Sequence, residues 1–336
     1  MRQNNIFLML LKVFFFSSIL VATSAVRAEL KVVTTIKPLH SLIANVMDGV
    51  GEPALIIEGS TSPHSFTLKP SHAKLLEEAD IIFWVGESIE TFMERPLESI
   101  VKNAEVVEFM EVESINKLKF REESIFEDHD DHDDHDDHDD HDDHDEHDDH
   151  DDHDDHDDHS GHDHHGHAHG EFDAHIWLDP MNAKEMVHEI AHELGDLDPA
   201  NKNKYEANAQ ATIQALDQLV NDIEKGINKD ARFVVFHDAY QYFEERFGVR
   251  AAGALTLNTD VLPGAKQIAD IQDVIKDRGI KCIFSEPQFN PKIITTIAED
   301  MNIKTGVFDP LGANIDSNKD LYFKLIQNLG NELKGC

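Results

Sequence analysis

The chain has 336 residues and a formal net charge of −38, with 67 acidic side chains against 29 basic ones. Twenty-three of the acidic residues lie within 127–169, a stretch that contains no Lys or Arg. This charge distribution repels nucleic acids and anionic membranes and attracts cations, so nucleic-acid binding is excluded from the expected functions. The chain is long enough for two domains of ordinary size.

The N-terminus has the pattern of a secretory signal peptide. Arg2 gives a positive start, the apolar run Ile6–Val21 follows, and small residues lead to a cleavage site expected after Ala28. The run is too short for a membrane anchor, and no later segment is long and apolar enough to span a membrane. Residues 1–28 are therefore predicted to be removed, which leaves an exported, soluble chain.

After the signal peptide, short apolar runs alternate with helical patterns. Buried strands are predicted at Leu30–Thr35, Ala54–Ile57, Ile81–Val85 and Val106–Phe109. Helices are predicted at His40–Val50 and Ser71–Ala79, the second with Ser71 as its N-cap. The alternation of strand and helix predicts a parallel sheet with helices on both faces.

Residues 127–170 form a tract that cannot build a core. Because it is almost free of apolar residues, we expect a disordered insertion there. His recurs at every third residue, eleven times, from His129 to His159, mostly as Asp-Asp-His. Such a tract offers imidazole and carboxylate ligands without fixed geometry, so we expect weak metal binding at many places. This binding should fade near pH 6, where imidazoles protonate.

The alternative for the tract is a solvated acidic spacer. The even spacing of its histidines favours metal binding. The residues expected to act as accessory, low-affinity metal ligands are His129, His132, His135, His138, His141, His144, His147, His150, His153, His156, His159, His162, His164, His165, His167 and His169.

A long helix is predicted after the tract, beginning at Asp198-Pro199 and ending near residue 228. Its apolar residues recur at steps of three and four: Tyr205, Ala209, Ile213, Leu216, Val220, Ile223 and Ile227. At about 1.5 Å per residue, such a helix spans on the order of 45 Å. It could therefore act as a rigid connector between two domains.

The strand and helix alternation returns beyond this helix. Strands are predicted at Arg232–Phe236, Lys281–Ser285 and Lys304–Phe308, and helices at Asp260–Arg278, Pro291–Asp300 and Asp320–Leu333. The predicted fold class is α/β, with two lobes of parallel sheet flanked by helices and joined by one long connecting helix. The predicted boundaries are 29–197 for the N-terminal lobe with its insertion at 127–170, 198–228 for the connecting helix, and 229–336 for the C-terminal lobe.

The two cysteines of the chain are Cys282 and Cys336. A disulfide is the default expectation in an exported protein. It would tie the last residue to the second half of the chain and stabilise the fold by about 4 kcal/mol in the chain-entropy model. Two free thiols are the alternative.

Polar side chains follow the predicted strands where a parallel sheet binds its ligands, beyond the carboxyl ends. His64 lies in the loop after Ala54–Ile57, and the other strands are followed directly by His237, Glu286 and Asp309. His175 begins a further segment just after the tract. Three imidazoles with a carboxylate or water form a typical tetrahedral zinc set, although ligand type alone separates zinc poorly from other first-row ions.

The same segments resemble a known family, the periplasmic zinc-binding proteins of bacterial ABC importers (the ZnuA type of the metal-specific solute-binding proteins). The resemblance runs from about Leu30 to Cys336. The matching stretches are Ser62-Pro63-His64, Lys69-Pro70-Ser71, Ile82–Gly86, Asp173–Pro180, Phe236–Phe243, Cys282–Phe289 and Phe308–Gly312. The acidic, His-rich insertion and the position of the two cysteines are also typical of the zinc branch.

The resemblance implies two α/β lobes joined by a long helix, with the metal ion between the lobes. By position, His64, His175 and His237 correspond to metal ligands. Asp309 matches an acidic fourth ligand of relatives and is weakly favoured here, Glu286 matches a position that other relatives use, and water is the third possibility. The implied function is a monomeric periplasmic Zn²⁺-binding protein that delivers zinc to an inner-membrane ABC permease, and not an enzyme.

Two other functions remain open from the sequence. The segment His188-Glu189-Ile190-Ala191-His192 fits the H-E-x-x-H pattern of zinc metallohydrolases, in which Glu189 would activate water. The pattern is short and no third ligand stands out downstream, so a plain helix surface is the competing interpretation. The other possibility is a metal buffer that uses the tract without any transporter.

Overall fold

The computed structural model describes residues 29–126, 171–257, 259 and 262–336. The predicted signal peptide at 1–28 and the His-rich tract, with all of its predicted accessory ligands, lie outside these residues. Among the described helices, none combines the length and the apolar character needed to cross a membrane.

The N-terminal lobe is built on a parallel sheet with the strand order β2-β1-β3-β4. Its strands are β1 (Val32–Thr34), β2 (Ala54–Leu55), β3 (Ile81–Trp84) and β4 (Glu105–Glu108). Its helices are α1 (Lys37–Val46), α2 (Pro70–Glu78) and α3 (Glu94–Ser99), with short 3-10 turns η1 (Pro63–Ser65), η2 (Thr91–Met93) and η3 (Phe109–Glu111). The central strands β1 and β3 are buried along their whole length, which explains their continuous apolar sequences.

The C-terminal lobe repeats this arrangement with the order β6-β5-β7-β8, again with all strands parallel. Its strands are β5 (Phe233–His237), β6 (Ala251–Thr256), β7 (Cys282–Ser285) and β8 (Lys304–Val307). Its helices are α6 (Gln241–Phe247), α7 (Ala265–Asp277), α8 (Lys292–Met301) and α9 (Leu321–Leu333). The predicted α/β fold class with two parallel sheets is confirmed.

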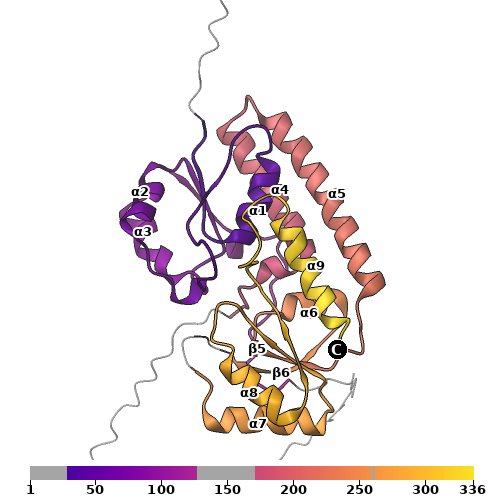
Figure 1. The fold of residues 1–336 in the computed structure, drawn as a ribbon. Coiled ribbons are helices and arrows are strands. Elements are labelled where there is room, and N and C mark those ends of the chain that lie inside the picture. The colour runs from indigo at the N-terminus through magenta and orange to yellow at the C-terminus, as the bar shows by residue number, and fades with distance from the viewer. Residues whose placement is uncertain (1–28, 127–170, 258, 260–261) are drawn as a thin grey trace, which may run out of the picture.

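Two helices lie between the sheets in the chain, α4 (Pro180–Leu197) and α5 (Lys202–Gly226), after the short turn η4 (Ile176–Leu178). They pack against each other, and α1 from the first lobe and α9 from the second both pack against α5 (Figure 1). At about 1.5 Å per residue, α5 extends for roughly 37 Å. The buried face of α5 carries the predicted stripe from Tyr205 to Ile223.

The connecting helix begins later than predicted. Asp198 closes α4, and α5 starts only at Lys202 after a turn in which the Asn201 side chain donates a hydrogen bond to Asp198. The Asp-Pro pair therefore belongs to a helix–helix junction and not to the N-terminus of one helix. The same pair of residue types is used as an N-cap at Asp179-Pro180, where the Asp179 carboxylate accepts from the Met181 amide at 2.8 Å.

Two elements of the second lobe were not predicted, the strand β6 and the helix α6. The strand has the sequence Ala-Ala-Gly-Ala-Leu-Thr, whose small residues give little strand signal. Gly253 is required there because a Cβ atom at this position would lie 2.6 Å from the Ser124 carbonyl oxygen. Residues 124–126 thus approach the edge of β6 closely.

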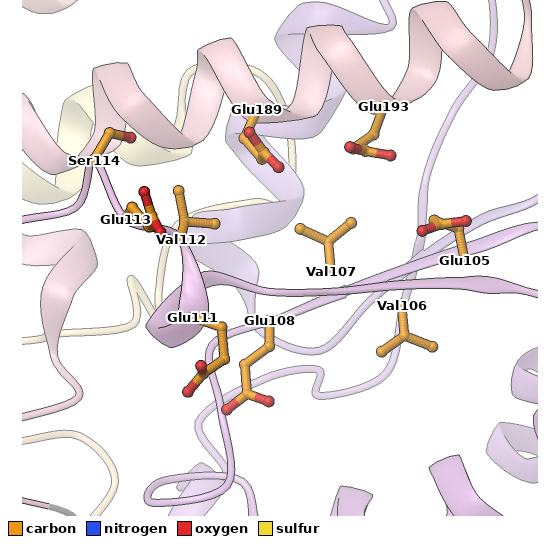
Figure 2. Close-up of a pocket in the computed structure, with 10 residues that line it drawn as sticks. All are labelled: Glu105, Val106, Val107, Glu108, Glu111, Val112, Glu113, Ser114, Glu189 and Glu193. Atoms are coloured by element: carbon orange, nitrogen blue, oxygen red, sulfur yellow. The ribbon is translucent and has the colours of Figure 1, made fainter.

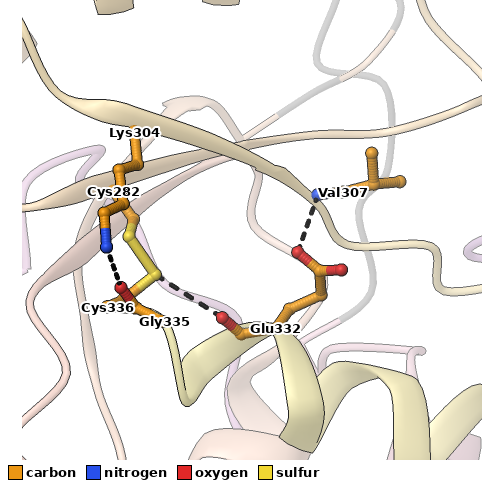
Figure 3. Close-up of a disulfide and its surroundings, with 6 residues drawn as sticks. All are labelled: Cys282, Lys304, Val307, Glu332, Gly335 and Cys336. Carbon is orange, nitrogen blue, oxygen red and sulfur yellow. Dashed lines mark hydrogen bonds between the residues drawn. A yellow bond between two sulfur atoms is a disulfide. The ribbon is translucent and has the colours of Figure 1, made fainter.

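The predicted disulfide between Cys282 and Cys336 is confirmed, with the two Cα atoms 5.7 Å apart and a separation of 54 residues. It joins the start of β7 to the C-terminus, beyond α9 (Figure 3). Nearby, the Lys304 ammonium donates to the Gly335 carbonyl at 2.7 Å. These contacts hold the C-terminal end of the chain against the sheet of its own lobe.

Candidate metal centre

Three histidines from three separate segments meet at the ends of the strands that face the other lobe. His64 lies in η1, after β2, where the Ser62 hydroxyl accepts a hydrogen bond from the His64 amide. His237 is the last residue of β5, and His175 directly precedes η4. His64 and His237 therefore lie beyond the carboxyl ends of parallel strands, as expected from the sequence, whereas His175 comes from a segment that directly follows no strand of either described sheet.

The three imidazoles converge tightly. One ring nitrogen of each of His64, His175 and His237 lies within 4.8 Å of the others. The ring centroids are 5.0 Å apart for His175 and His237, 5.5 Å for His64 and His175, and 5.4 Å for His64 and His237. No other cluster of this kind occurs in the ranges 29–126, 171–257 and 262–336. Three imidazoles at these separations can share one transition-metal ion.

Buried carboxylates fix the orientation of two of the rings. The Asp173 carboxylate accepts from Nδ1 of His175 at 2.7 Å, and both Glu286 oxygens lie 3.3 Å from Nδ1 of His237. With Nδ1 as the donor, the lone pair is on Nε2, which becomes the nitrogen available for a metal ion. Carboxylate–imidazole pairs of this kind commonly orient metal ligands and make them more basic.

The surroundings of His237 shift its proton affinity. Burial by itself lowers the pKa of His237, but the Glu286, Asp238 and Asp173 carboxylates together outweigh burial and raise the pKa above the ordinary value. Burial also raises the pKa of the neighbouring Asp238 carboxyl to about 7, against the opposing effect of Arg121. The centre is thus a buried region with several carboxyl groups close to the imidazoles.

The two candidate fourth ligands have different environments. Asp309 caps its own turn, because its carboxylate accepts from the amides of Leu311, Gly312 and Ala313 at 2.6 to 3.2 Å. A further hydrogen bond comes from the Gln288 side chain. Glu286 is buried and contacts His237 as described. Neither carboxylate belongs to the tight group of three histidines.

The space beside the imidazoles is small. One cavity that His64, His175 and His237 line has a volume of about 20 Å³, and a second one about 10 Å³. The buried Trp177 ring, 5.3 Å from that of His175, forms part of the wall and donates its indole N–H to the Pro310 carbonyl at 2.8 Å. Such a site fits an ion and has no room for an organic substrate.

The H-E-x-x-H segment lies elsewhere, on α4. His188 and His192 are exposed, and Nε2 of His192 lies 3.9 Å from Asp196. Figure 2 shows that Glu189 and Glu193 of the same helix face β4 and the η3 region across an acidic groove. The groove is lined further by Glu105, Val106, Val107, Glu108, Glu111, Val112, Glu113 and Ser114. The tight imidazole set needed for a hydrolytic zinc site is not formed here within the described chain.

Two residues that support the centre were not assigned a role from the sequence. Asp173 stands two residues before His175, so the short spacing in Asp-Ala-His was a usable signal. Arg121 forms ion pairs with Asp238 and Glu244. No sequence pattern could indicate Arg121, because 117 residues separate it from Asp238.

Comparison with known proteins gives a consistent result. The family model described as "ZnuA: Zinc-uptake complex component A periplasmic" matches residues 32–336. The chain is 51% identical over 307 residues to the high-affinity zinc uptake system protein ZnuA of Brucella abortus (strain 2308), covering 91% of each chain. It is 32% identical over 322 residues to the protein of the same name from Yersinia pestis, covering 95% of each.

Solved structures agree in fold. A crystal structure of ZnuA superposes with a TM-score of 0.68 at 20% identity, covering 90% of this chain and 98% of that one. The laminin-binding protein Lmb of Streptococcus agalactiae superposes with a TM-score of 0.67 at 23% identity, covering 91% and 100%. From the family match and the identity to its relatives, the chain belongs to the ZnuA family of periplasmic zinc-uptake components.

Proposed function

We propose that this protein is the high-affinity Zn²⁺-binding component of an ABC importer, and that His64, His175 and His237 hold the ion between the two lobes. The observation that carries the proposal is the convergence of these three imidazoles within 4.8 Å in a buried site. The family consists of transport components and not of enzymes, so the hydrolase alternative based on His188 and His192 is set aside.

The chemistry of the donor set fits zinc. Imidazole nitrogens suit Zn²⁺, whereas a site dominated by carboxylates would favour Mn²⁺. We assign Glu286 to orienting His237 and Asp309 to capping its turn, since its oxygens already accept several hydrogen bonds. The fourth coordination position then falls to a water molecule. Three imidazoles with a water are also the ligand set of catalytic zinc sites, so the assignment to transport rests on the family and not on this ligand set.

We place the protein in the periplasm as a monomer that passes zinc to an inner-membrane permease. The family description names a periplasmic component of a zinc-uptake complex. The disulfide of the second lobe supports an oxidising compartment. Release to the permease would require the His64 side and the His237 side of the centre to separate, since they belong to different lobes.

The test is zinc titration in competition with a chromophoric chelator. Replacing His64, His175 and His237 together by Ala should abolish the tight site, while circular dichroism stays unchanged. The matched control is the pair His188→Ala and His192→Ala, which should leave the tight site intact. Survival of tight binding in the triple variant would refute the assignment, and its loss in the control would revive the hydrolase alternative.

A second experiment addresses the tract. Deletion of residues 128–169 should leave one tight zinc site and reduce the total amount of metal bound per chain, as measured by equilibrium dialysis. An accessory role in collecting ions predicts this outcome. Loss of the tight site upon deletion would instead favour a metal buffer centred on the tract.

A further inference from the structure

Residues Leu118–Phe126, which we call the strap, connect the His175 segment to the C-terminal lobe. Its first part pairs with the residues just before His175. The Asp173 amide donates to the Leu118 carbonyl at 2.9 Å, and the Phe120 amide donates to the Glu171 carbonyl at 3.1 Å. The strap therefore fixes the backbone position of Asp173, the residue that holds His175.

The last part of the strap pairs with the edge of the C-terminal sheet. Ile125 forms an antiparallel bridge with Gly253 of β6. The Ala254 amide donates to the Ser124 carbonyl at 2.8 Å, and the Phe126 amide donates to the Ala252 carbonyl at 3.1 Å. Nine residues thus link the segment that carries His175 to the sheet whose strand β5 carries His237.

Arg121 lies in the middle of the strap and faces the second lobe. Its guanidinium bonds Asp238 Oδ1 at 2.9 Å and Glu244 Oε2 at 2.7 Å, and it stacks over the Phe126 ring at 4.1 Å. The side chains of Asp238 and Glu244 are 2% and 3% exposed. Two buried carboxylates therefore depend on one cation, and removing one partner of a buried ion pair is strongly destabilising.

These ion pairs reach both sides of the metal centre. Asp238 directly follows His237, and Asp173, which bonds His175, attracts Arg121 electrostatically. Burial by itself lowers the pKa of Arg121, but Glu244, Asp238 and Asp173 together outweigh burial and raise it, so the guanidinium remains charged. The Tyr242 hydroxyl adds a neutral tie, since it donates to the Asp173 carbonyl at 2.6 Å and accepts from the Leu118 amide.

We propose that Arg121 is a positioning residue of the zinc site, which sets the spacing between His175 and His237 and thereby slows zinc release. The inference rests on the proposed assignment of these histidines as ligands. Without Arg121, the strap loses its charged contact with Asp238 and Glu244, and these buried carboxyl groups lose the cation that holds them to the strap. The two imidazoles then separate more readily, which speeds dissociation and leaves capture of the ion almost unchanged.

The test measures the zinc dissociation rate by stopped-flow mixing with excess chelator. Arg121→Ala should raise this rate by about tenfold or more, while the association rate changes by less than about twofold, as expected when contacts act on dissociation. Arg121→Lys should fall in between, because an ammonium cannot bond two carboxylates in the planar, forked manner of a guanidinium. If the alanine variant fails to fold, the zinc dissociation rate of the lysine variant tests the proposal in its place.

The matched control is Arg246→Ala. Arg246 also pairs with a buried carboxylate, Asp179, at 2.6 and 2.7 Å, but that carboxylate contacts none of the three histidines through a hydrogen bond within the described structure. The Arg246→Ala variant should have a lower melting temperature than the wild type, and its zinc dissociation rate should change by no more than about twofold. Equal dissociation rates for Arg121→Ala and Arg246→Ala, or a wild-type rate for Arg121→Ala, would overturn the proposal.

A second readout does not require zinc. Hydrogen exchange of the Ala254 and Asp173 amides, which bond the strap, should accelerate in metal-free Arg121→Ala and not in Arg246→Ala. Together with zinc binding by the triple histidine variant, this measurement distinguishes a wrong ligand assignment from a wrong role for Arg121. If the triple histidine variant still binds zinc tightly, the ligand assignment is wrong whatever the strap does. If that variant loses zinc but Arg121→Ala matches the wild type in dissociation and in exchange, only the role of Arg121 is wrong.

Discussion

The two lobes have sheets of equivalent topology, yet a buried glutamate after the corresponding strand serves a different purpose in each. In the first lobe, Glu90 follows β3 and its carboxylate accepts from the amides of Val85 and Gly86 at 2.7 and 3.3 Å. In the second lobe, Glu286 follows β7 directly and lies against the ring of His237. One carboxylate closes a loop, whereas the other orients an imidazole.

The lobes also differ in how they are held together. Both cysteines lie in the second lobe, where the disulfide joins β7 to the C-terminus. The first lobe contains no cysteine and therefore no disulfide. Sheets of equivalent topology therefore do not fix the role of the buried glutamate, which is decided by its partner: backbone amides for Glu90 and the His237 ring for Glu286.

The largest expected effect comes from removing one imidazole from either lobe. Structural zinc sites bind with about 10–16 kcal/mol, so one of three or four ligands contributes roughly 4 kcal/mol, or about a thousandfold in affinity. His64→Ala and His237→Ala should weaken zinc binding to a similar extent in competition titrations. A large difference between the two would show that one lobe alone holds the ion.

Removal of the disulfide should affect stability and not binding. Cys282→Ser with Cys336→Ser opens a loop of 54 residues and should lower the free energy of unfolding by about 2–4 kcal/mol. The measurement is urea denaturation of the metal-free protein, with zinc affinity as the control. A large loss of affinity would mean that the disulfide also shapes the metal centre.

Glu286→Gln should weaken zinc binding by roughly 10- to 100-fold, the range seen for groups that hold metal ligands. The amide retains the size of the side chain but loses the charge that favours a basic His237. The matched variant Glu90→Gln should leave zinc affinity unchanged, because Glu90 bonds backbone amides. If the two substitutions weakened zinc binding equally, Glu286 would have no special role in orienting His237.

The last effect is a pH dependence of stability due to Glu90, which vanishes in acid. Burial raises the pKa of Glu90 from 4.5 to about 7. The folded state thus favours the protonated carboxyl, so its contribution to stability is complete below pH 4.5 and is lost as the pH rises through 7. Glu90→Gln should remove this decline, which amounts to at most about 3 kcal/mol.

Urea denaturation of the metal-free protein between pH 4.5 and 8 tests this expectation. The variant should be more stable than the wild type at pH 8 and close to it at pH 4.5. Parallel curves for the two proteins across this range would show that the Glu90 carboxyl ionises in the folded state as it does in the unfolded chain.

Much of the fold could be predicted because the strongest signals are local. The buried strands β1, β3 and β5 are continuous apolar runs, and the stripe on α5 has helical spacing. The strand β6 was missed because its small residues give little strand signal, and the need for Gly253 arises from the close approach of Ser124, a tertiary contact. The start of α5 was misplaced because Asp-Pro pairs serve at both helix starts and helix junctions.

For the site, the sequence by itself pointed to the three histidines that converge in the structure, to the second-lobe disulfide pair, and to strand ends as the place of His64 and His237. These follow from residue type and from the topology of parallel sheets. Only the tertiary structure decided which carboxylate serves which purpose: Asp173 and Glu286 face imidazoles, Asp309 caps its own turn, and Glu90 closes a loop. The physical reason is that a buried carboxylate is defined by its partners, and hydrogen-bond partners far apart in the chain leave no pattern in it.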